Sequence, residues 1–175
     1  MKYSDIYRLY STSQPKDAIH QALREVPVDD SDEQYEDRSP LHLACQYGDA
    51  EGVKILLERD AEPNTKDANG STPIHILGRT SAGCADEDKL KEIAVMLMEH
   101  GANIPRSAKN TTALIECVRN RHFKMAEAII NSGARVNSTD LNGENVLFGL
   151  CAASGDIKRD IQFAKKELDE SVQYS

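Results

Sequence analysis

Histidine and cysteine are the side chains in this 175-residue chain whose spacing could bind a metal or supply a nucleophile. His42 and Cys45 stand three positions apart, so on a helix both would lie on one face and could bind the same zinc ion. A zinc site takes three or four protein ligands, and no further ligand has a spacing that joins this pair. We therefore expect no metal site and no cofactor.

Catalytic motifs are missing from the sequence. It contains no nucleophile elbow, no phosphate-binding glycine loop and no paired carboxylates of the kind that acid–base catalysis uses. Its acidic pairs fall in expected loops or first helical turns, without an apolar cleft to change their pKa values. The sequence therefore predicts that the protein is not an enzyme. His20, His100 and His122 have no patterned partner, and we expect them at the surface.

A turn that leads into a helix is encoded in residues 67–75. Asn69-Gly70 predicts a tight turn with two positive φ angles. Thr72 stands at the N-cap position and Pro73 at the first helical position, while His75 can bond back to the cap. Similar phrases begin at Ser39, Thr112 and Asn145.

The spacing of these helix starts is regular. Ser39 and Thr72 are 33 residues apart, as are Thr112 and Asn145, whereas Thr72 and Thr112 are 40 apart. A second phrase closes each unit, at residues 60–64, 101–104 and 133–137. An eight-residue insertion in the second unit, followed by a turn shortened by one residue, accounts for the longer spacing.

A period near 33 with these phrases resembles the ankyrin repeat, in which each unit is a turn followed by two antiparallel helices. The match rests on Ser39-Pro40-Leu41-His42-Leu43-Ala44 with Gly48, and on Asp67, Gly70, Thr72, Pro73 and His75. The resemblance covers roughly residues 34 to 155. The resemblance implies an all-α repeat solenoid of helix-turn-helix units joined by β-turn or hairpin loops.

We expect residues 1–175 to form a single ankyrin repeat domain. Apolar residues at three- and four-residue spacings predict two short helices, at 3–10 and 16–26, as a degenerate N-terminal cap. The expected units are the cap with an acidic loop at 1–33, repeats at 34–66, 67–106 and 107–139, a C-terminal capping repeat at 140–170, and a tail at 171–175.

Two further expectations follow from the aligned units. Cys45, Cys117 and Cys151 fall at positions that are small in the ankyrin pattern, so we expect buried free thiols, whereas Cys84 lies in the insertion. Asp60 stands where later units have Gly101 and Gly133, at the point where a helix ends in the left-handed conformation.

The net charge of −8 argues against general affinity for nucleic acid or an anionic membrane. There is no apolar run of membrane-spanning length and no signal-peptide core after Met1. Cysteine usage suits a reducing compartment, so we expect a cytoplasmic protein, in its own cell or in a host cell if it is an effector. Because both caps look polar, we expect a monomer.

The resemblance implies that a partner protein binds in a concave groove, formed by the turn tips and the exposed face of each first helix. Basic residues at these positions cluster over the middle two units, with no carboxylate among the exposed groove positions there: Lys66, Arg79, Arg106, Lys109 and Arg119. One interpretation is a seat for an acidic partner segment, with Tyr35 and Tyr47 as aromatic anchors at one end. The alternative is that these side chains are ordinary solubilising residues, or that the acidic segment 29–37 neutralises them.

Several alternatives remain open at this stage. The acidic segment 29–37 is either a solvated loop or a docking strip for a basic partner, and the insertion at 79–88 is either a tolerated surface loop or a contact. The main function hypothesis is a non-catalytic protein-binding module. The alternative is a regulatory or targeting ankyrin module of a larger enzyme or secreted effector, and nucleic-acid binding by the basic cluster is the weakest hypothesis because of the net charge.

Overall fold

The computed structural model describes residues 1–80, 86–103, 112–134, 139, 143 and 146. Within these residues the helices are α1 (Tyr3–Ser11), α2 (Lys16–Glu25), α3 (Pro40–Gln46), α4 (Ala50–Leu57), α5 (Pro73–Gly78), α6 (Glu87–Glu99), α7 (Ala113–Arg119) and α8 (Phe123–Asn131), with a 3₁₀ turn, η1 (Glu33–Tyr35). The described part contains no β-strand, which confirms the all-α expectation.

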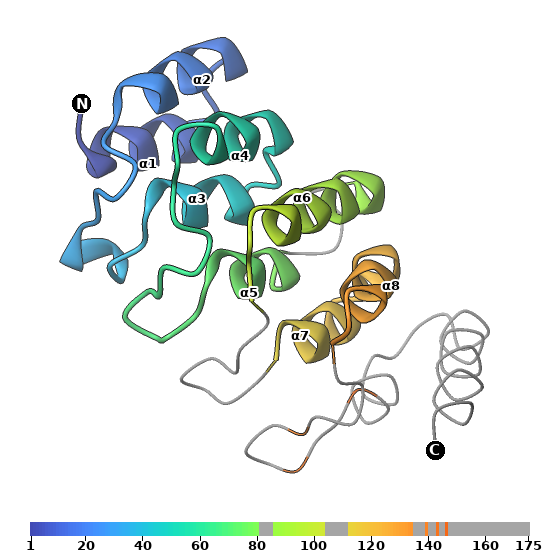
Figure 1. The fold of residues 1–175 in the computed structure, drawn as a ribbon. Coiled ribbons are helices and arrows are strands. Elements are labelled where there is room, and N and C mark those ends of the chain that lie inside the picture. Colours follow the sequence, from blue (N-terminus) through green and yellow to red (C-terminus); the bar gives the residue numbers. More distant parts are fainter. Residues whose placement is uncertain (81–85, 104–111, 135–138, 140–142, 144–145, 147–175) are drawn as a thin grey trace.

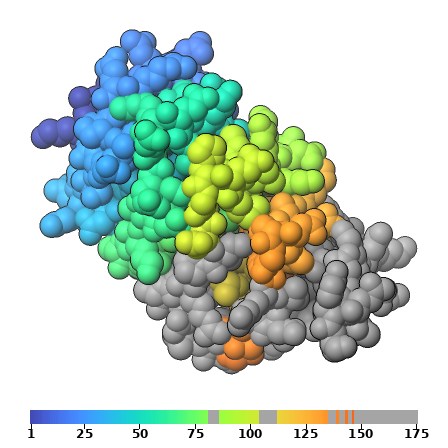
Figure 2. Space-filling view, viewed as in Figure 1, coloured from blue at the N-terminus to red at the C-terminus, as the bar shows by residue number. Residues whose placement is uncertain are grey.

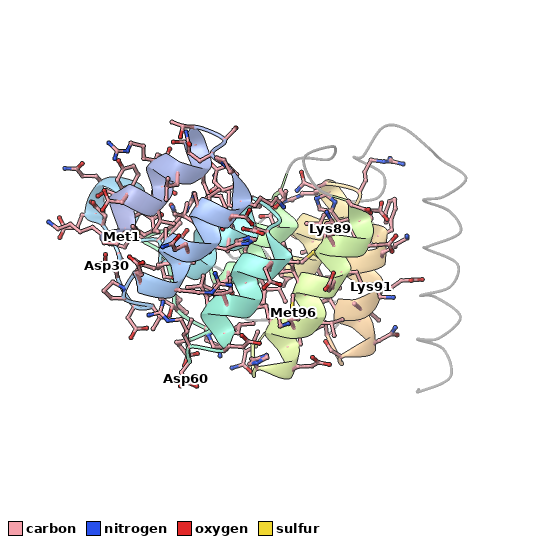
Figure 3. All side chains as sticks on the ribbon, turned by 90° about the horizontal axis from the view of Figure 1, so that it is seen from above. Met1, Asp30, Asp60, Lys89, Lys91 and Met96 are labelled. Carbon is pink, nitrogen blue, oxygen red and sulfur yellow. The ribbon has the colours of Figure 1, made fainter. Side chains whose placement is uncertain are left out.

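The helices form two stacked layers (Figure 1). In the inner layer α1 packs on α3, α3 on α5, and α5 on α7; in the outer layer α2 packs on α4, α4 on α6, and α6 on α8. Figure 3 shows α4, α6 and α8 side by side from above, and Figure 2 shows the units following one another along the body in chain order. Each helix pair therefore stacks on the next, as in a solenoid.

The predicted helix starts at Ser39, Thr72 and Thr112 are confirmed, and the one at Asn145 lies outside the described residues. Ser39 and Thr72 each form a capping box with the histidine three residues later, and Thr112 Oγ1 accepts a hydrogen bond from the backbone N–H of Ile115 at 3.2 Å. A proline follows the cap in α3 and α5, where its missing N–H costs nothing. Local sequence therefore determines where each inner helix begins.

The N-terminal helices are part of the stack. Ile6 on α1, Leu23 on α2 and Val26 after it are all fully buried in one continuous core with the repeats. Arg59 ties the two parts together, since its Nη1 donates to the carbonyl of Val26 at 2.8 Å. The predicted helices at 3–10 and 16–26 are confirmed.

Two of the four cysteines lie within the described residues. Cys45 and Cys117 are buried free thiols, as expected, and burial raises the pKa of both. Cys84 and Cys151 lie outside the described residues, as do residues 81–85 of the insertion at 79–88. After it, Asp86 caps α6 by accepting a hydrogen bond from the backbone N–H of Asp88 at 3.0 Å.

The turn at 67–71 differs from the prediction. Gly70 has a positive φ of 67°, but Asn69 does not, so the expected turn with two positive φ angles is wrong. Asp67 is the reason: its Oδ1 accepts hydrogen bonds from the backbone N–H groups of Asn69 and Ser71, at 2.9 and 2.8 Å. These bonds stabilise a longer turn in which only the glycine needs the left-handed region.

Candidate protein-binding surface

The turns that precede α3 and α5 lie side by side and are bonded to each other. The backbone N–H of Ala68 donates to the carbonyl of Glu36 at 2.8 Å, which joins the tip of one turn to the next. In Figure 1 these turns project from the same side of the inner helices. Turns and inner helices thus form one continuous face.

A buried histidine fixes the relative position of neighbouring units. His42 Nδ1 accepts a hydrogen bond from the backbone N–H of Ser39 at 3.1 Å, so the ring proton must lie on Nε2. Nε2 then donates to the carbonyl of Ser71 at 3.0 Å, in the turn of the next unit. Because both nitrogens are used, His42 has no lone pair left for a metal.

No group of three or more potential metal ligands was found among the described residues. Nor does any helix in that part of the chain have the length and apolar character needed to cross a membrane.

Arg38 links the first two units on the same face. Its Nη1 donates to Gln46 Oε1 at 2.9 Å, and its Nε lies 3.6 Å from the buried carboxylate of Asp67. A third contact is an ion pair with Glu36. The guanidinium charge is therefore shared among partners from both turns, so Arg38 acts mainly as an internal link.

Arg79, a predicted partner-binding residue, already has partners within the chain. Its Nε donates to Glu116 Oε1 at 3.0 Å, and its Nη1 donates to Ser71 Oγ at 2.9 Å. The side chain keeps 26% of its surface exposed. Glu116 was not among the groove positions considered in the sequence, but it places a carboxylate beside Arg79, so part of the positive charge of the basic cluster is balanced within the chain.

Of the other four predicted basic residues, the structure describes Lys66 and Arg119. Lys66 is exposed at the turn tip. Arg119 is half-buried and has an interaction partner within the chain. Arg106 and Lys109 lie outside the described residues.

The predicted aromatic anchors belong to two tyrosine groups at the N-terminal end. Tyr47 stacks on Tyr10, with ring centroids 4.8 Å apart and planes 11° apart, and remains 37% exposed. Tyr35 is half-buried and packs against the rings of Tyr7 and Tyr3, at 4.3 and 5.6 Å. Sequence reasoning missed the α1 tyrosines as site residues, although their i, i+4, i+7 spacing places them on one helical face.

A buried polar cluster joins the cap to the first repeat. Asp49 accepts a hydrogen bond from the hydroxyl of Tyr10 at 2.9 Å, and His20 Nε2 lies 3.0 and 3.1 Å from its two oxygens. Burial is the main cause that raises the pKa of Tyr10, and the nearby Asp49 carboxylate adds to it. His20 is therefore half-buried and structural, which corrects the surface expectation.

His122 was also expected at the surface but is buried, whereas His100 is exposed as expected. The His122 ring is 2% exposed, and its Nε2 lies 2.6 Å from the carbonyl of Thr80. It stands at the start of α8, in the place that Asp49 takes before α4. Both side chains hold the start of an outer helix against the preceding unit.

Comparison with known proteins identifies the repeats. A family model described as "Ankyrin repeats (many copies)" matches residues 22–77, and one described as "Ankyrin repeat" matches residues 109–141. The matches include neurogenic locus notch homolog protein 1 of Mus musculus, 34% identical over 134 residues, which are 76% of this chain and 5% of that protein. They also include a transient receptor potential cation channel subfamily A member 1 homolog of Caenorhabditis elegans, 38% identical over 69 residues, which are 39% of this chain and 6% of that protein.

A fungal relative matches over a similar range. Ankyrin repeat protein nuc-2 of Neurospora crassa is 29% identical over 124 residues, which are 70% of this chain and 10% of that protein. In each relative the matched segment is thus a small part of a much longer protein. The two family models match about half of this chain between them, and the stacked helix pairs agree with them, so the chain belongs to the ankyrin repeat family.

Proposed function

We propose that this chain binds a partner protein through the face made by the turns and the inner helices α3, α5 and α7, without a catalytic step. Ankyrin repeats generally mediate protein–protein interaction, which supports this class of function. The residues that we propose for the contact are those of the sequence prediction: Tyr35, Tyr47, Lys66, Arg79, Arg106, Lys109 and Arg119.

The observation that carries the proposal is the series of bonds that connects neighbouring units along this face. His42 bonds the turn of the next unit, Ala68 bonds the preceding turn, and Arg79 pairs with Glu116 on the following inner helix. A surface held in place before binding loses little conformational entropy when a partner docks. The face therefore suits recognition of a folded or extended protein segment.

For the partner we propose an acidic segment. Lys66 is exposed, and the Arg79 side chain keeps 26% of its surface exposed, although Glu116 neutralises some of its charge. Attraction of this kind steers association and weakens as salt is added. We further propose a monomer in a reducing, cytoplasmic compartment, which the free thiols of Cys45 and Cys117 support.

Affinity capture from a lysate of the source organism, read by mass spectrometry, tests the proposal. The parent chain is compared with a Lys66→Glu, Lys109→Glu double variant, which leaves the internal ion pair of Arg79 intact. The matched control is Lys54→Glu, Lys91→Glu, which makes the same change in charge at exposed positions of the outer helices α4 and α6.

We expect a protein with an acidic segment to be captured by the parent and by the control, and lost by the groove variant while that variant keeps its helical circular dichroism spectrum. Equal capture by all three chains would contradict the proposal that the basic groove residues make the contact. If the parent chain captures no protein from a lysate of the cells that express it, the proposal of protein binding is contradicted.

A second candidate is that the chain serves as the interaction module of a larger protein. The relatives favour it, since the matched segment is 5% of the mouse protein and 10% of the fungal one. An antibody raised against residues 1–80 tests this on an immunoblot of the source cells. A band well above the 19.4 kDa of this chain would support the larger protein, and a band at that mass would contradict it.

A further inference from the structure

A small pocket opens between α1 and the turn segment that precedes α3. Its volume is about 200 Å³, and it is lined by Tyr3, Tyr7, Gln34, Tyr35, Glu36 and Arg38. Figure 1 shows the segment around η1 lying beside α1, at the N-terminal end of the face described above. A single side chain of a partner has a suitable size for this space.

Three of the six residues that line the pocket are tyrosines. Tyr7 and Tyr35 pack at 4.3 Å with their planes tilted by 36°, and Tyr3 lies 5.6 Å from Tyr35. Tyr7 and Tyr35 are half-buried, so part of their surface faces the pocket. The electron-rich faces of such rings attract cations.

Two polar atoms of the lining residues lack a hydrogen-bond partner: the Tyr3 hydroxyl, and Arg38 Nε, which lies 3.6 Å from the Asp67 carboxylate. Tyr3 is only 1% exposed, and its hydroxyl makes no hydrogen bond. Burial raises the pKa of this hydroxyl, so it stays protonated and neutral. A buried polar group without a partner is uncommon and costly, and a ligand that donates a hydrogen bond to the hydroxyl oxygen would relieve part of that cost.

The charge around the pocket is negative. The segment from Asp29 to Asp37 carries six carboxylates in nine residues. Glu36 lines the pocket with its side chain 52% exposed. Among the described lining residues Arg38 is the cation. Its single positive charge lies beside two carboxylates, those of Glu36 and Asp67, so the three groups together keep a net negative charge.

We propose that this pocket binds a lysine or arginine side chain from a basic segment of a partner protein. The cation would lie against the tyrosine faces, donate to the carboxylate of Glu36, and have the Tyr3 hydroxyl oxygen as a further acceptor. An acidic side chain would instead face Glu36 and its neighbouring carboxylates. The inference rests on the proposed protein-binding function and shares Tyr35 with it, but its test changes Glu36 and leaves Lys66 and Lys109 as they are, so the two can fail separately.

A fluorescein-labelled ten-residue glycine–serine peptide that carries three lysines is a direct probe, used with the full chain at low salt. The control peptide has three glutamines in place of the lysines. The site variant is Glu36→Gln, and its matched control is Glu58→Gln, which removes one exposed carboxylate at the end of α4. Binding is read by fluorescence anisotropy, and ¹H–¹³C spectra of the tyrosine rings report the site directly.

We expect the lysine peptide to bind and the glutamine peptide not to bind. Glu36→Gln should weaken binding about two- to fivefold relative to Glu58→Gln, which is the change in affinity expected when one contact to a cation is lost. Ring signals of Tyr7 and Tyr35 should shift in the parent chain, and that result needs no variant to fold. Equal binding to Glu36→Gln and Glu58→Gln, unshifted ring signals, or binding of the glutamine peptide as tight as that of the lysine peptide would each overturn the proposal. None of these results depends on Lys66 or Lys109, so the groove proposal is tested independently.

Discussion

At the scale of single residues, Asp60 ends an outer helix in a conformation that later units give to glycine. Its φ is 62°, and the backbone N–H of Ala61 donates to the carbonyl of Leu56, as Ala102 does to Leu97 after Gly101. Figure 3 shows Asp60 at the edge of the molecule, beyond the end of α4. A side chain with a Cβ is strained in this left-handed region.

We therefore expect Asp60→Gly to raise the free energy of unfolding by about 0.5–1 kcal/mol, which is a rise of roughly 1–4 °C in melting temperature. Thermal denaturation followed by circular dichroism measures this. Asp60→Ala is the control, because it removes the same charge and keeps the strained Cβ. If alanine stabilises the fold as much as glycine does, charge and not backbone conformation is the cause.

His42 makes stability depend on pH. Burial lowers the pKa of its imidazole below the ordinary value. Nδ1 accepts a hydrogen bond from the backbone N–H of Ser39, which it can do only while the ring is neutral. In the unfolded chain the ring takes up a proton below about pH 6.5, whereas the folded chain resists this. Unfolded molecules then bind more protons, so the contribution to stability falls as the pH drops from 7 toward 5.

The expected result is a free energy of unfolding that declines over this range by a smaller amount in His42→Gln than in the parent. The glutamine variant should also be less stable at pH 7, because its side chain cannot reproduce both bonds of the ring. Urea denaturation at pH 7, 6 and 5 measures both effects. Parallel pH profiles for the two proteins would show that His42 is not the titrating group.

At the scale of elements, the start of each inner helix could be predicted from the sequence and its internal links could not. Ser39, Thr72 and Thr112 were predicted as caps because capping depends on residues within one turn. The shape of the turn at 67–71 was not, since Asp67 bonds two backbone amides that the Asn-Gly signal does not anticipate. Pairing at longer range, such as Arg79 with Glu116, needs the stacking of α5 on α7 to be known first.

The ion pair between α5 and α7 should contribute measurably to stability. Arg79 and Glu116 are 26% and 13% exposed, so solvent screens their attraction only in part. A double-mutant cycle with Arg79→Gln and Glu116→Gln should give a coupling free energy of about 0.5–1 kcal/mol, which decreases in 0.5–1 M salt. A coupling near zero would mean that Arg79 is free to serve a partner without loss to the fold.

At Gly52 in helix α4, an added methyl group has two opposite effects on stability: higher helix propensity and a clash with buried polar atoms. Gly52 lies within α4, where alanine normally stabilises a helix by about 1 kcal/mol. A Cβ at this position would meet Asp49 Oδ2 at 2.7 Å and the Tyr10 hydroxyl at 2.9 Å, inside the buried cluster that holds the cap.

We expect Gly52→Ala to lower the free energy of unfolding by about 1–3 kcal/mol, because the polar cluster has to open. Glu51→Ala, an exposed neighbour on the same helix, is the control and should leave stability nearly unchanged. Chemical denaturation of both variants decides the sign. A stabilised Gly52→Ala would mean that the cap moves away from α4 at little cost.

At the scale of the whole molecule, the repeat class was predictable because a period of 33 survives substitutions in any single unit. The candidate site was predicted less well. The groove positions followed from the repeat register, but the partners of Arg79 and the tyrosines around Tyr35 come from the way neighbouring units and the cap meet. Contacts of this kind depend on three-dimensional stacking and leave no local pattern in the sequence.

The same stacking predicts that the N-terminal helices are needed for the stability of the repeats. In a solenoid each unit is stabilised mainly by its neighbours, and α1 and α2 cover the sides of α3 and α4 that no other described unit covers. Removing residues 1–28 would take α1 away from α3 and α2 away from α4, and would leave Arg59 without the carbonyls of Leu23 and Val26 that it binds.

We expect the shortened chain to melt about 10 °C or more below the complete chain and to bind a hydrophobic dye, since several kcal/mol of interface are lost and each kcal/mol shifts the melting temperature by about 2–4 °C. Differential scanning fluorimetry and dye binding at equal concentration measure both. An unchanged melting temperature without dye binding would show that the repeats are stable alone. The N-terminal helix pair would then be an element that the repeats do not need in order to fold. The pocket that α1 shares with the first turn would then point to a binding role for α1 and not to a role in stability.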